Sequence, residues 1–336
     1  VPKTGNYHIG IERGNATKGW ARIDSAQLGA AKLQREQTIF TTQVPTDFDE
    51  INTDAGKTAA YELGTRFSTK KSGWITKVRM YTYVNESGDH TVRIWDYDKN
   101  EVVAGPYNWN VAKGTQGWQE FELPEAVHVD AGKAYVVAIS NGETRYYARG
   151  KSSDNDFSTP IVNGDLITYS DSGLFSTSLG TMPNKVNKTV NYFRDVVFVP
   201  EQTIFTSQLP TDFDLELKNT YNLGTRFKTT MPGKITKARI YTHEKESGVH
   251  IVRLWDWNSK TVLAGPYNWD VQAGTTGWQE FELPEPLTVE AGKDYMISVT
   301  NGTKSYYARG KSGASSFASP IINGDLVTYV GSGYYS

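Results

Sequence analysis

The sequence predicts an all-β protein made of two tandem antiparallel β-sandwich (jelly-roll-like) domains with an N-terminal strand extension. Three observations support this fold class. Most of the chain is an internal repeat, and its 20 Tyr, 9 Trp and 31 Gly favour strands and turns over helices. Short alternating runs are separated by turn residues, with no sustained helical period. The length of 336 residues also suits two domains, because single cores rarely grow past about 250 residues.

The repeated unit is a whole domain. Residues 63–173 align without a gap with residues 223–333, and both copies carry Ala-Gly-Pro-Tyr-Asn-Trp, Gly-Trp-Gln-Glu-Phe-Glu-Leu-Pro-Glu and Tyr-Tyr-Ala-Arg-Gly-Lys-Ser. So long a period indicates two domains rather than a solenoid. We place domain 1 at residues 37–200 and domain 2 at residues 201–336, with almost no linker between them.

The strands of the first copy can be placed in chain order from their patterns. Residues 75–83 and 90–95 alternate between apolar and polar side chains, as does the run 118–123, which we expect to end at Pro124. Residues 134–140 are almost continuously apolar, which is typical of a strand buried on both faces. Turn residues separate these runs at 132–133, 141–142 and 163–165.

Only one segment has helical character. Residues 15–36 are expected to form a linker, and within it residues 25–35 could form a short helix. Ser25 is a suitable N-cap, and Leu28, Ala31 and Leu33 form a weak apolar stripe.

A set of motifs spread over both copies resembles a known family, the DUF4082 domain. The motifs are Glu-Leu-Gly-x-x-Phe, Gly-x-Ile-Thr-Lys-x-Arg, Gly-x-His-x-x-Arg-x-Trp, Gly-Trp-Gln-Glu-Phe, Ala-Gly-Lys-x-Tyr and Asn-Tyr-x-x-Asp-Val-Val-Phe, at residues 62–67, 73–79, 88–95, 117–121, 131–135 and 191–198. The second copy departs at Asn222, where Glu is usual. The resemblance covers nearly all of residues 37–336. It implies β-sandwich binding modules without catalysis, in secreted bacterial proteins and often beside carbohydrate-active modules.

The second copy lacks a counterpart of the last segment of the first. Ser336 aligns with Ser176, so the second copy has no equivalent of residues 177–200. The N-terminal run Lys3-Thr4-Gly5-Asn6-Tyr7 matches residues 188–192 at every position but the third. Residues 1–14 are therefore a candidate donor strand.

The donor candidate continues as an ordinary half-buried strand, because Ile9 and Ile11 alternate with smaller or polar residues. In the same alignment, Ile11 falls on Val196. The residues expected to carry strand donation are Lys3, Thr4, Asn6, Tyr7, Ile9 and Ile11.

A sandwich that lacks a strand exposes unpaired backbone groups, which a strand from elsewhere can cover. Exchange between subunits would join each chain to the next, giving a head-to-tail polymer or a ring. Two other arrangements stay open at this point. The N-terminal strand could fold back into its own chain, or it could pack locally while the missing strand lies in a further C-terminal portion.

Composition and motifs exclude several function classes. The net charge of −2 gives no electrostatic case for nucleic-acid binding, and no apolar run approaches the roughly 20 residues of a membrane span. The absence of cysteine excludes disulfides, thiolate metal sites and cysteine nucleophiles. No nucleophile elbow, P-loop or dinucleotide fingerprint is present. We expect no enzyme, because two near-identical copies would require two active sites.

Recurring aromatic residues are the candidates for a ligand site. An outward-facing Trp or Tyr beside polar groups could stack on a sugar ring, and neighbours on a strand face opposite sides. A core role is the competing interpretation, because a shared fold would retain the same residues. The glycan-binding candidates are Tyr97, Trp109, Tyr146, Arg149, Trp257, Trp269, Tyr306 and Arg309.

A calcium site is the only cofactor site that the sequence suggests. Asp47 and Asp49 recur as Asp212 and Asp214 in an acidic Thr-Asp-Phe-Asp turn. Oxygen-rich loops can hold Ca²⁺, although two carboxylates are fewer than its usual ligands and Asp also caps turns.

We therefore expect a noncatalytic, extracellular or cell-surface structural or adhesive subunit that assembles head to tail by strand donation. The alternative is a monomeric secreted carbohydrate-binding tandem module, with extracellular glycans as partners.

Overall fold

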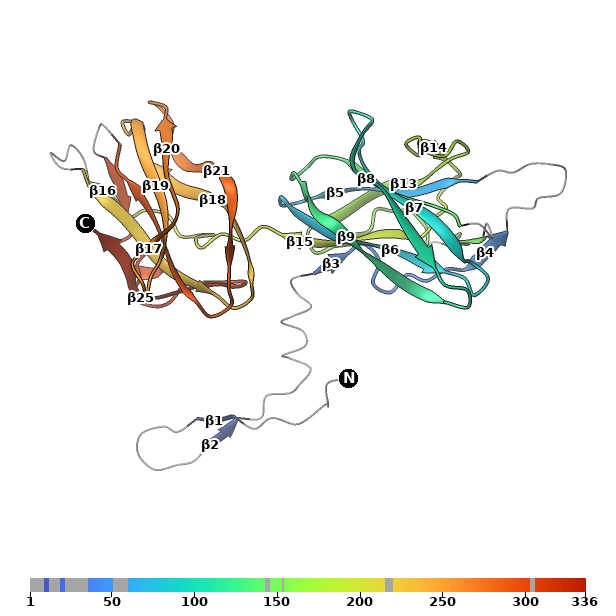
Figure 1. The fold of residues 1–336 in the computed structure, drawn as a ribbon, viewed down its shortest axis with the longest axis horizontal. Helices are drawn as coiled ribbons and strands as arrows, with labels where there is room; N and C mark the ends of the chain where they lie inside the picture. The colour runs from blue at the N-terminus through green and yellow to red at the C-terminus, as the bar shows by residue number, and fades with distance from the viewer. Residues whose placement is uncertain are drawn as a thin grey trace. The chain divides into compact units, whose positions relative to one another are not determined.

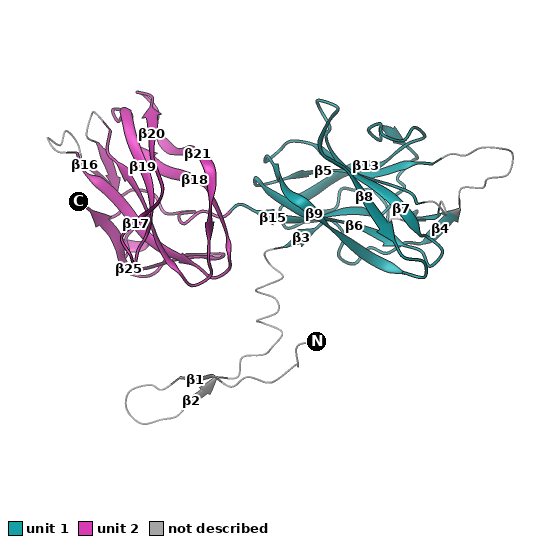
Figure 2. Ribbon diagram, in the orientation of Figure 1, with its two compact units in different colours: residues 1–201 teal, residues 202–336 magenta. Residues whose placement is uncertain are grey.

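Strands make up nearly all the regular structure of this computed structural model (Figure 1). In the part of the chain that it describes, the only helical element is a 3₁₀ turn at Gly313–Ser315. The chain divides into unit 1, Val1–Glu201, and unit 2, Gln202–Ser336 (Figure 2). The predicted all-β fold class is confirmed. The described residues are 9–11, 19–21, 36–50, 60–142, 146–152, 154–214, 220–302 and 306–336.

The larger sheet of unit 1 is antiparallel and has the strand order β12-β13-β5-β10-β7-β8, with β14 paired to β13. Every residue of β10 is buried, because the strand lies in the middle of a sheet that is covered on both faces. The strands are β12 (Val162–Asn163), β13 (Leu166–Ser176), β5 (Glu62–Thr69), β10 (Tyr135–Ser140), β7 (Gly88–Asp96), β8 (Glu101–Val111) and β14 (Lys185–Val186).

The second sheet of unit 1 has the order β3-β15-β6-β9. Apolar side chains from both sheets form one core cluster, which includes Phe67, Ile75, Val137 and Val196. A short ribbon pairs β4 with β11. The strands are β3 (Gln37–Thr38), β15 (Arg194–Pro200), β6 (Gly73–Thr82), β9 (Gly117–Val129), β4 (Asp47–Glu50) and β11 (Tyr146–Arg149).

One predicted strand boundary is wrong. Strand β9 does not end at Pro124 but continues to Val129. In the described residues β9 pairs only with β6, so it is an edge strand, where proline costs no ladder hydrogen bond on its open side. The register shifts between Ile75 and Lys77 of β6, which accommodates the irregularity.

Unit 2 repeats the larger sheet but only half of the smaller one. Its larger sheet has the order β20-β19-β22-β17-β25-β24, and within the described residues β18 pairs with β21 alone. A ribbon of β16 and β23 matches the ribbon of unit 1. The strands are β20 (Val262–Val271), β19 (Gly248–Asp256), β22 (Asp294–Thr300), β17 (Asn222–Thr229), β25 (Leu326–Tyr335), β24 (Ile322–Asn323), β18 (Gly233–Thr242), β21 (Gly277–Val289), β16 (Asp212–Asp214) and β23 (Tyr307–Arg309).

The N-terminal region is described only in part. Strand β1 (Ile9–Ile11) pairs with β2 (Gly19–Ala21) in an antiparallel register. The expected helix over residues 25–35 lies outside the described residues, as do the donor candidates Lys3, Thr4, Asn6 and Tyr7.

Candidate functional site: a strand-acceptor groove

Strand β15 is the central element of the smaller sheet in unit 1. It pairs with β6 on one side and with β3 on the other. Residues 194–198 are all buried, and Val196 and Phe198 belong to the main core cluster. The run Val-Val-Phe-Val suits this position, because both faces of the strand are covered.

Phe193, just before β15, fills an aromatic pocket. Its ring centroid lies 5.5 Å from that of Phe40, 6.2 Å from that of Tyr81 and 6.1 Å from that of Trp118. The side chain is completely buried. Aromatic pairs at such distances contribute beyond the area they bury, so Phe193 anchors the strand.

Two buried charged residues fix the start of β15. The carboxylate of Asp195 accepts hydrogen bonds from the backbone N–H of Ile39 at 2.8 Å and of Val196 at 2.7 Å. Burial raises the pKa of Asp195 to about 6, against the opposing effects of Arg79 and the backbone donors. The preceding Arg194 lies 3.6 Å from the Glu86 carboxylate, and burial lowers its pKa.

The residues before Phe193 are held mainly by their backbone. Phe157 donates its backbone N–H to the Thr189 carbonyl at 2.7 Å, and Asn191 exchanges two backbone hydrogen bonds with Gly150. Val190 packs close to Gly173, where an added Cβ would overlap the Val190 carbonyl oxygen. The extended segment 189–198 therefore has a continuous binding surface within unit 1.

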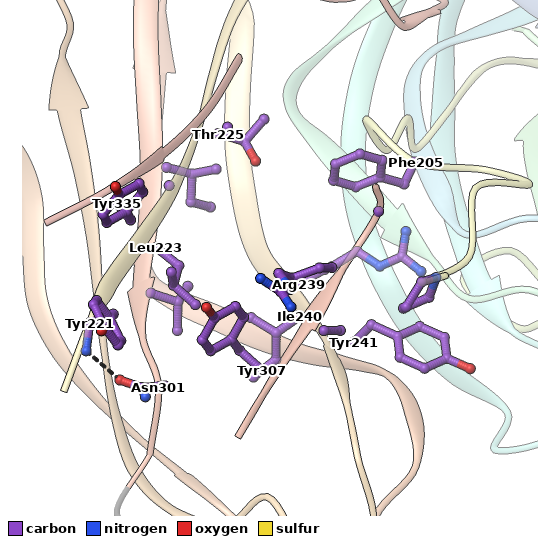
Figure 3. Close-up of a pocket in the computed structure, with 18 of the residues that line it drawn as sticks. Phe205, Tyr221, Leu223, Thr225, Arg239, Ile240, Tyr241, Asn301, Tyr307 and Tyr335 are labelled. Atoms are coloured by element: carbon purple, nitrogen blue, oxygen red, sulfur yellow. Dashed lines mark hydrogen bonds between the residues drawn. The ribbon is translucent and has the colours of Figure 1, made fainter. Parts of the chain in front are cut away.

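Unit 2 has an open groove of about 720 Å³ at the corresponding place (Figure 3). Phe205, Tyr241 and Trp278 line it, as the counterparts of the residues that surround Phe193 in unit 1. The groove also contains the counterparts of residues that contact other parts of the segment 189–198. These are Tyr221, Leu223, Arg239, Glu246, Tyr307, Gly310, Phe317 and Gly333.

The groove runs along an unpaired sheet edge. In the described residues, β18 pairs only with β21, whereas its counterpart β6 lies between β9 and β15. Gln202 and Thr203, the counterparts of β3, do not form a strand, because β3 is paired only with β15 in unit 1. Both differences between the smaller sheets follow from one unfilled strand position.

The same side chains are buried in unit 1 and partly exposed in unit 2. Phe40 and Leu63 are each 1% exposed, whereas Phe205 and Leu223 are only partly buried. Tyr147 and Phe157 are buried, whereas their counterparts are not. Unit 2 therefore presents apolar side chains that would be covered by a strand.

The charged groups of the groove have partners within unit 2. The guanidinium Nε of Arg239 lies 3.0 Å from a Glu280 carboxylate oxygen, whereas Arg79 faces Asp195 in unit 1. Glu246 is paired with His250 at 3.0 Å. An occupant without the charges of Arg194 and Asp195 would therefore leave neither Arg239 nor Glu246 unpaired.

The outer face of the larger sheet also differs, and this difference was not anticipated from the sequence. In unit 1 the segment after β13 covers it, with Met182 packed against Trp95, Val136 and Ala138. In unit 2, Ser298 replaces Ala138 and accepts a hydrogen bond from Trp255 Nε1 at 2.8 Å.

Tyr334 is a second replacement on the outer face of unit 2. It replaces Leu174, and its ring centroid lies 4.6 Å from that of Trp257. The outer face of unit 2 thus has Ser298 and Tyr334 where unit 1 has Ala138 and Leu174, whereas the groove keeps the aromatic side chains that surround Phe193 in unit 1.

The proposed glycan-binding aromatic residues do not form a platform. Trp109 and Trp269 are each 9% exposed and belong to the core clusters, so their expected exposure is wrong. Tyr306 is also buried, and its ring stacks on His243. The two Trp rings face inward because the sandwich core needs large side chains at those positions.

The other candidates already interact with neighbouring side chains. Tyr97 and Trp257 lie beside the guanidinium groups of Arg66 and Arg226. Tyr146 packs against Tyr83 on the ribbon. Arg149 forms ion pairs with aspartates of β4, and Arg309 pairs with an aspartate of β16.

The calcium hypothesis loses its basis in the structure. Asp47 accepts hydrogen bonds from Arg149 and Lys151, each at 2.7 Å, and Arg149 also pairs with Asp49. The bond from Lys151, with that from Arg149, lowers the pKa of Asp47. Asp212 is paired in the same way in unit 2, and the side chain of Asp214 lies outside the described residues. Across the described ranges, no group of three His, Cys, Asp or Glu side chains could hold a metal ion.

The strand pattern and the two units agree with a comparison against protein families. Residues 47–194 and residues 207–336 each match the family described as "Domain of unknown function (DUF4082)". The chain belongs to this family. It contains two tandem DUF4082 domains, as the motifs predicted. No curated protein is significantly similar to the chain. No helix in the described ranges has the length and apolar character needed to cross a membrane.

Proposed function

We propose that the protein is a noncatalytic extracellular structural subunit that assembles by strand donation. In this assembly, residues 1–13 of one copy fill the groove of unit 2 in a second copy. The observation that carries the proposal is a double match. The groove of unit 2 has the side chains that hold residues 189–198 in unit 1, and residues 3–7 repeat the sequence of residues 188–192.

The donor sequence has matching side chains at the positions of Tyr192 and Val196, and His8 takes the place of the anchor Phe193. In the alignment, Tyr7 takes the place of Tyr192, which packs against Tyr147 in unit 1 with ring centroids 6.0 Å apart. Ile11 takes the place of the core residue Val196. Ile9 takes the place of Arg194, whose counterion Glu86 corresponds to a glutamate that His250 already pairs in unit 2.

The expected energies favour a stable contact. Burying Ile9 and Ile11 would contribute about 1.5–3 kcal/mol each, and the new ladder hydrogen bonds about 1 kcal/mol each. Ordering the donor offsets part of this gain. Because each copy offers a donor segment and an acceptor groove at different places, the contact is heterologous and produces a filament or a closed ring.

The outer face of unit 2 supports a donor that begins near Lys3. In unit 1 the segment that leads into β15 first covers the outer face of the larger sheet. In unit 2 that face is covered by its own side chains, with Ser298 bound to Trp255. Filling of the groove by residues 3–11 would not require this face to be covered as well.

The test is the oligomeric state of the full chain and of a variant that lacks residues 1–13, measured by sedimentation and light scattering. We expect concentration-dependent assembly of the full chain and its complete loss on deletion. A synthetic peptide of residues 1–13 should then bind the deleted chain and raise the unfolding midpoint of unit 2.

Point variants provide matched controls. Ile9→Asp or Ile11→Asp should weaken assembly by at least tenfold, because an unpaired charge would be buried. Glu12→Gln should weaken assembly far less, because residue 12 falls on the other face of the strand and the substitution introduces no charge there. A full chain that stays monomeric at high concentration with both units folded would contradict exchange between copies.

A further inference from the structure

We infer that the donor enters the groove in a single register, with the backbone of Gly5 crossing Gly333. This inference rests on the proposed strand donation and specifies its geometry. It follows from a glycine that unit 2 by itself does not require.

Gly173 and Gly333 occupy the same position of the two larger sheets. Gly173 is buried, and an added Cβ would overlap the carbonyl oxygen of Val190. Gly333 is exposed, and an added Cβ would meet only ring carbons of Phe317, at 3.4 and 3.5 Å. These are ordinary contact distances, so unit 2 alone has room for an alanine there.

Backbone conformation does not explain Gly333 either. Its φ lies outside the left-handed region, in contrast to the neighbouring Gly331, which has a φ of 71°. A glycine at this position would be required if the donor backbone passed Gly333 as closely as the Val190 backbone passes Gly173. In the alignment of residues 3–7 with residues 188–192, the residue that takes the place of Val190 is Gly5.

The alternation of the donor selects the same register. Arg194 pairs with Met80 and Val196 with Val78, so Ile9 would lie opposite Ile240 and Ile11 opposite Ala238. A slip by one residue would turn Gly10 and Glu12 toward the core in place of the isoleucines.

The charges agree with this register. Val197 pairs with Lys77 in unit 1, so Glu12 would lie opposite Lys237 in unit 2. Opposite charges at directly paired positions of an antiparallel ladder stabilise the pairing.

The chain has no cysteine, so disulfide trapping in the full-length protein tests the register directly. The double variant Glu12→Cys with Lys237→Cys should form a ladder of disulfide-linked oligomers under mild oxidation. The control is the double variant Glu12→Cys with Arg239→Cys, in which the donor must slip by two residues to bring the cysteines together. It should form at least tenfold fewer disulfide-linked oligomers. A disulfide formed within one chain would show that the donor fills the groove of its own chain, and it would overturn the proposal that a second copy supplies the donor.

Gly333→Ala provides the second arm. We expect an unchanged circular dichroism spectrum and at least a tenfold loss of assembly, whereas Val330→Ala on the same strand should assemble normally. Wild-type assembly by Gly333→Ala, or preferential trapping of the slipped pair, would overturn the register and leave strand donation intact. Failure of the wild-type chain to assemble would overturn both proposals.

Discussion

Units 1 and 2 contain the same groove, filled in one and open in the other. In unit 1 the groove holds Phe193 and β15, and the surrounding Phe40, Leu63, Tyr147 and Phe157 are buried. In unit 2 their counterparts line a space of about 720 Å³. The aromatic side chains around Phe193 are retained in unit 2, whereas Ala138 and Leu174 on the outer face of the larger sheet are replaced by Ser298 and Tyr334. The comparison indicates that the groove of unit 2 is suited to a strand.

The comparison also indicates how the two units differ in stability. When the groove is unfilled, unit 2 lacks the apolar surface that one further strand would bury. The backbone groups along the β18 edge also have no ladder partners in the described residues. Unit 2 should therefore unfold before unit 1 in a chain without donor. Three substitutions can break or sharpen this comparison.

The largest effect is expected for Phe193→Ala. Removing a fully buried ring from the pocket of Phe40, Tyr81 and Trp118 should lower the unfolding free energy of unit 1 by about 3–5 kcal/mol. Chemical denaturation that resolves the two transitions measures it. In the chain lacking residues 1–13, Phe205→Ala should cost unit 2 clearly less than the equivalent Phe40→Ala costs unit 1. Equal losses for these two variants would contradict the difference between filled and open grooves.

The next effect concerns pH and Asp195. Its pKa is raised from 3.8 to about 6, so between these values the folded state binds more protons than the unfolded state. The contribution of Asp195 to stability therefore falls as pH rises through this window, by about 3 kcal/mol in total. Carboxylates with lowered pKa values, such as Asp47, act in the opposite direction.

The Asp195 prediction is therefore tested as a difference between two proteins. Asp195→Asn should abolish the pH-dependent contribution of this carboxyl group. The difference in unfolding free energy of unit 1 between wild type and variant should therefore change from pH 4 to pH 7, with the wild type losing stability relative to the variant as the pH rises. Unit 2 has no counterpart of Asp195 in its described residues, and its transition is the internal control. A gap that does not change with pH would contradict the raised pKa.

The smallest effect concerns the outer face. Ser298→Ala removes the hydrogen bond from Trp255 Nε1 and should destabilise unit 2 by about 1 kcal/mol. Thermal unfolding of unit 2 measures it, with the exposed Ser259→Ala expected to stay within about 0.5 kcal/mol of wild type. If Ser298→Ala unfolds at the same temperature as wild type, the hydrogen bond from Trp255 does not stabilise this face.

Several parts of the fold could be read from local patterns. The alternation of residues 90–95 and the apolar run 134–140 correspond to β7 and β10, because period and burial are properties of consecutive residues. The continuation of β9 past Pro124 could not be read, because only its edge position makes the proline harmless. The inward orientation of Trp109 likewise depends on which face of the sheet the second sheet covers.

The sequence by itself determined the repeat, the family, the all-β class and the likeness between the N-terminus and residues 188–192. These are relations between residues along the chain, and alignment reveals them. Tertiary structure alone decided that Phe205, Tyr241 and Gly333 meet in one open groove, because they come from segments far apart in sequence. It also decided that the glycan candidates Trp109, Trp269 and Tyr306 are buried and that Asp47 and Asp49 are ion-paired, because burial and pairing depend on neighbours that only folding supplies.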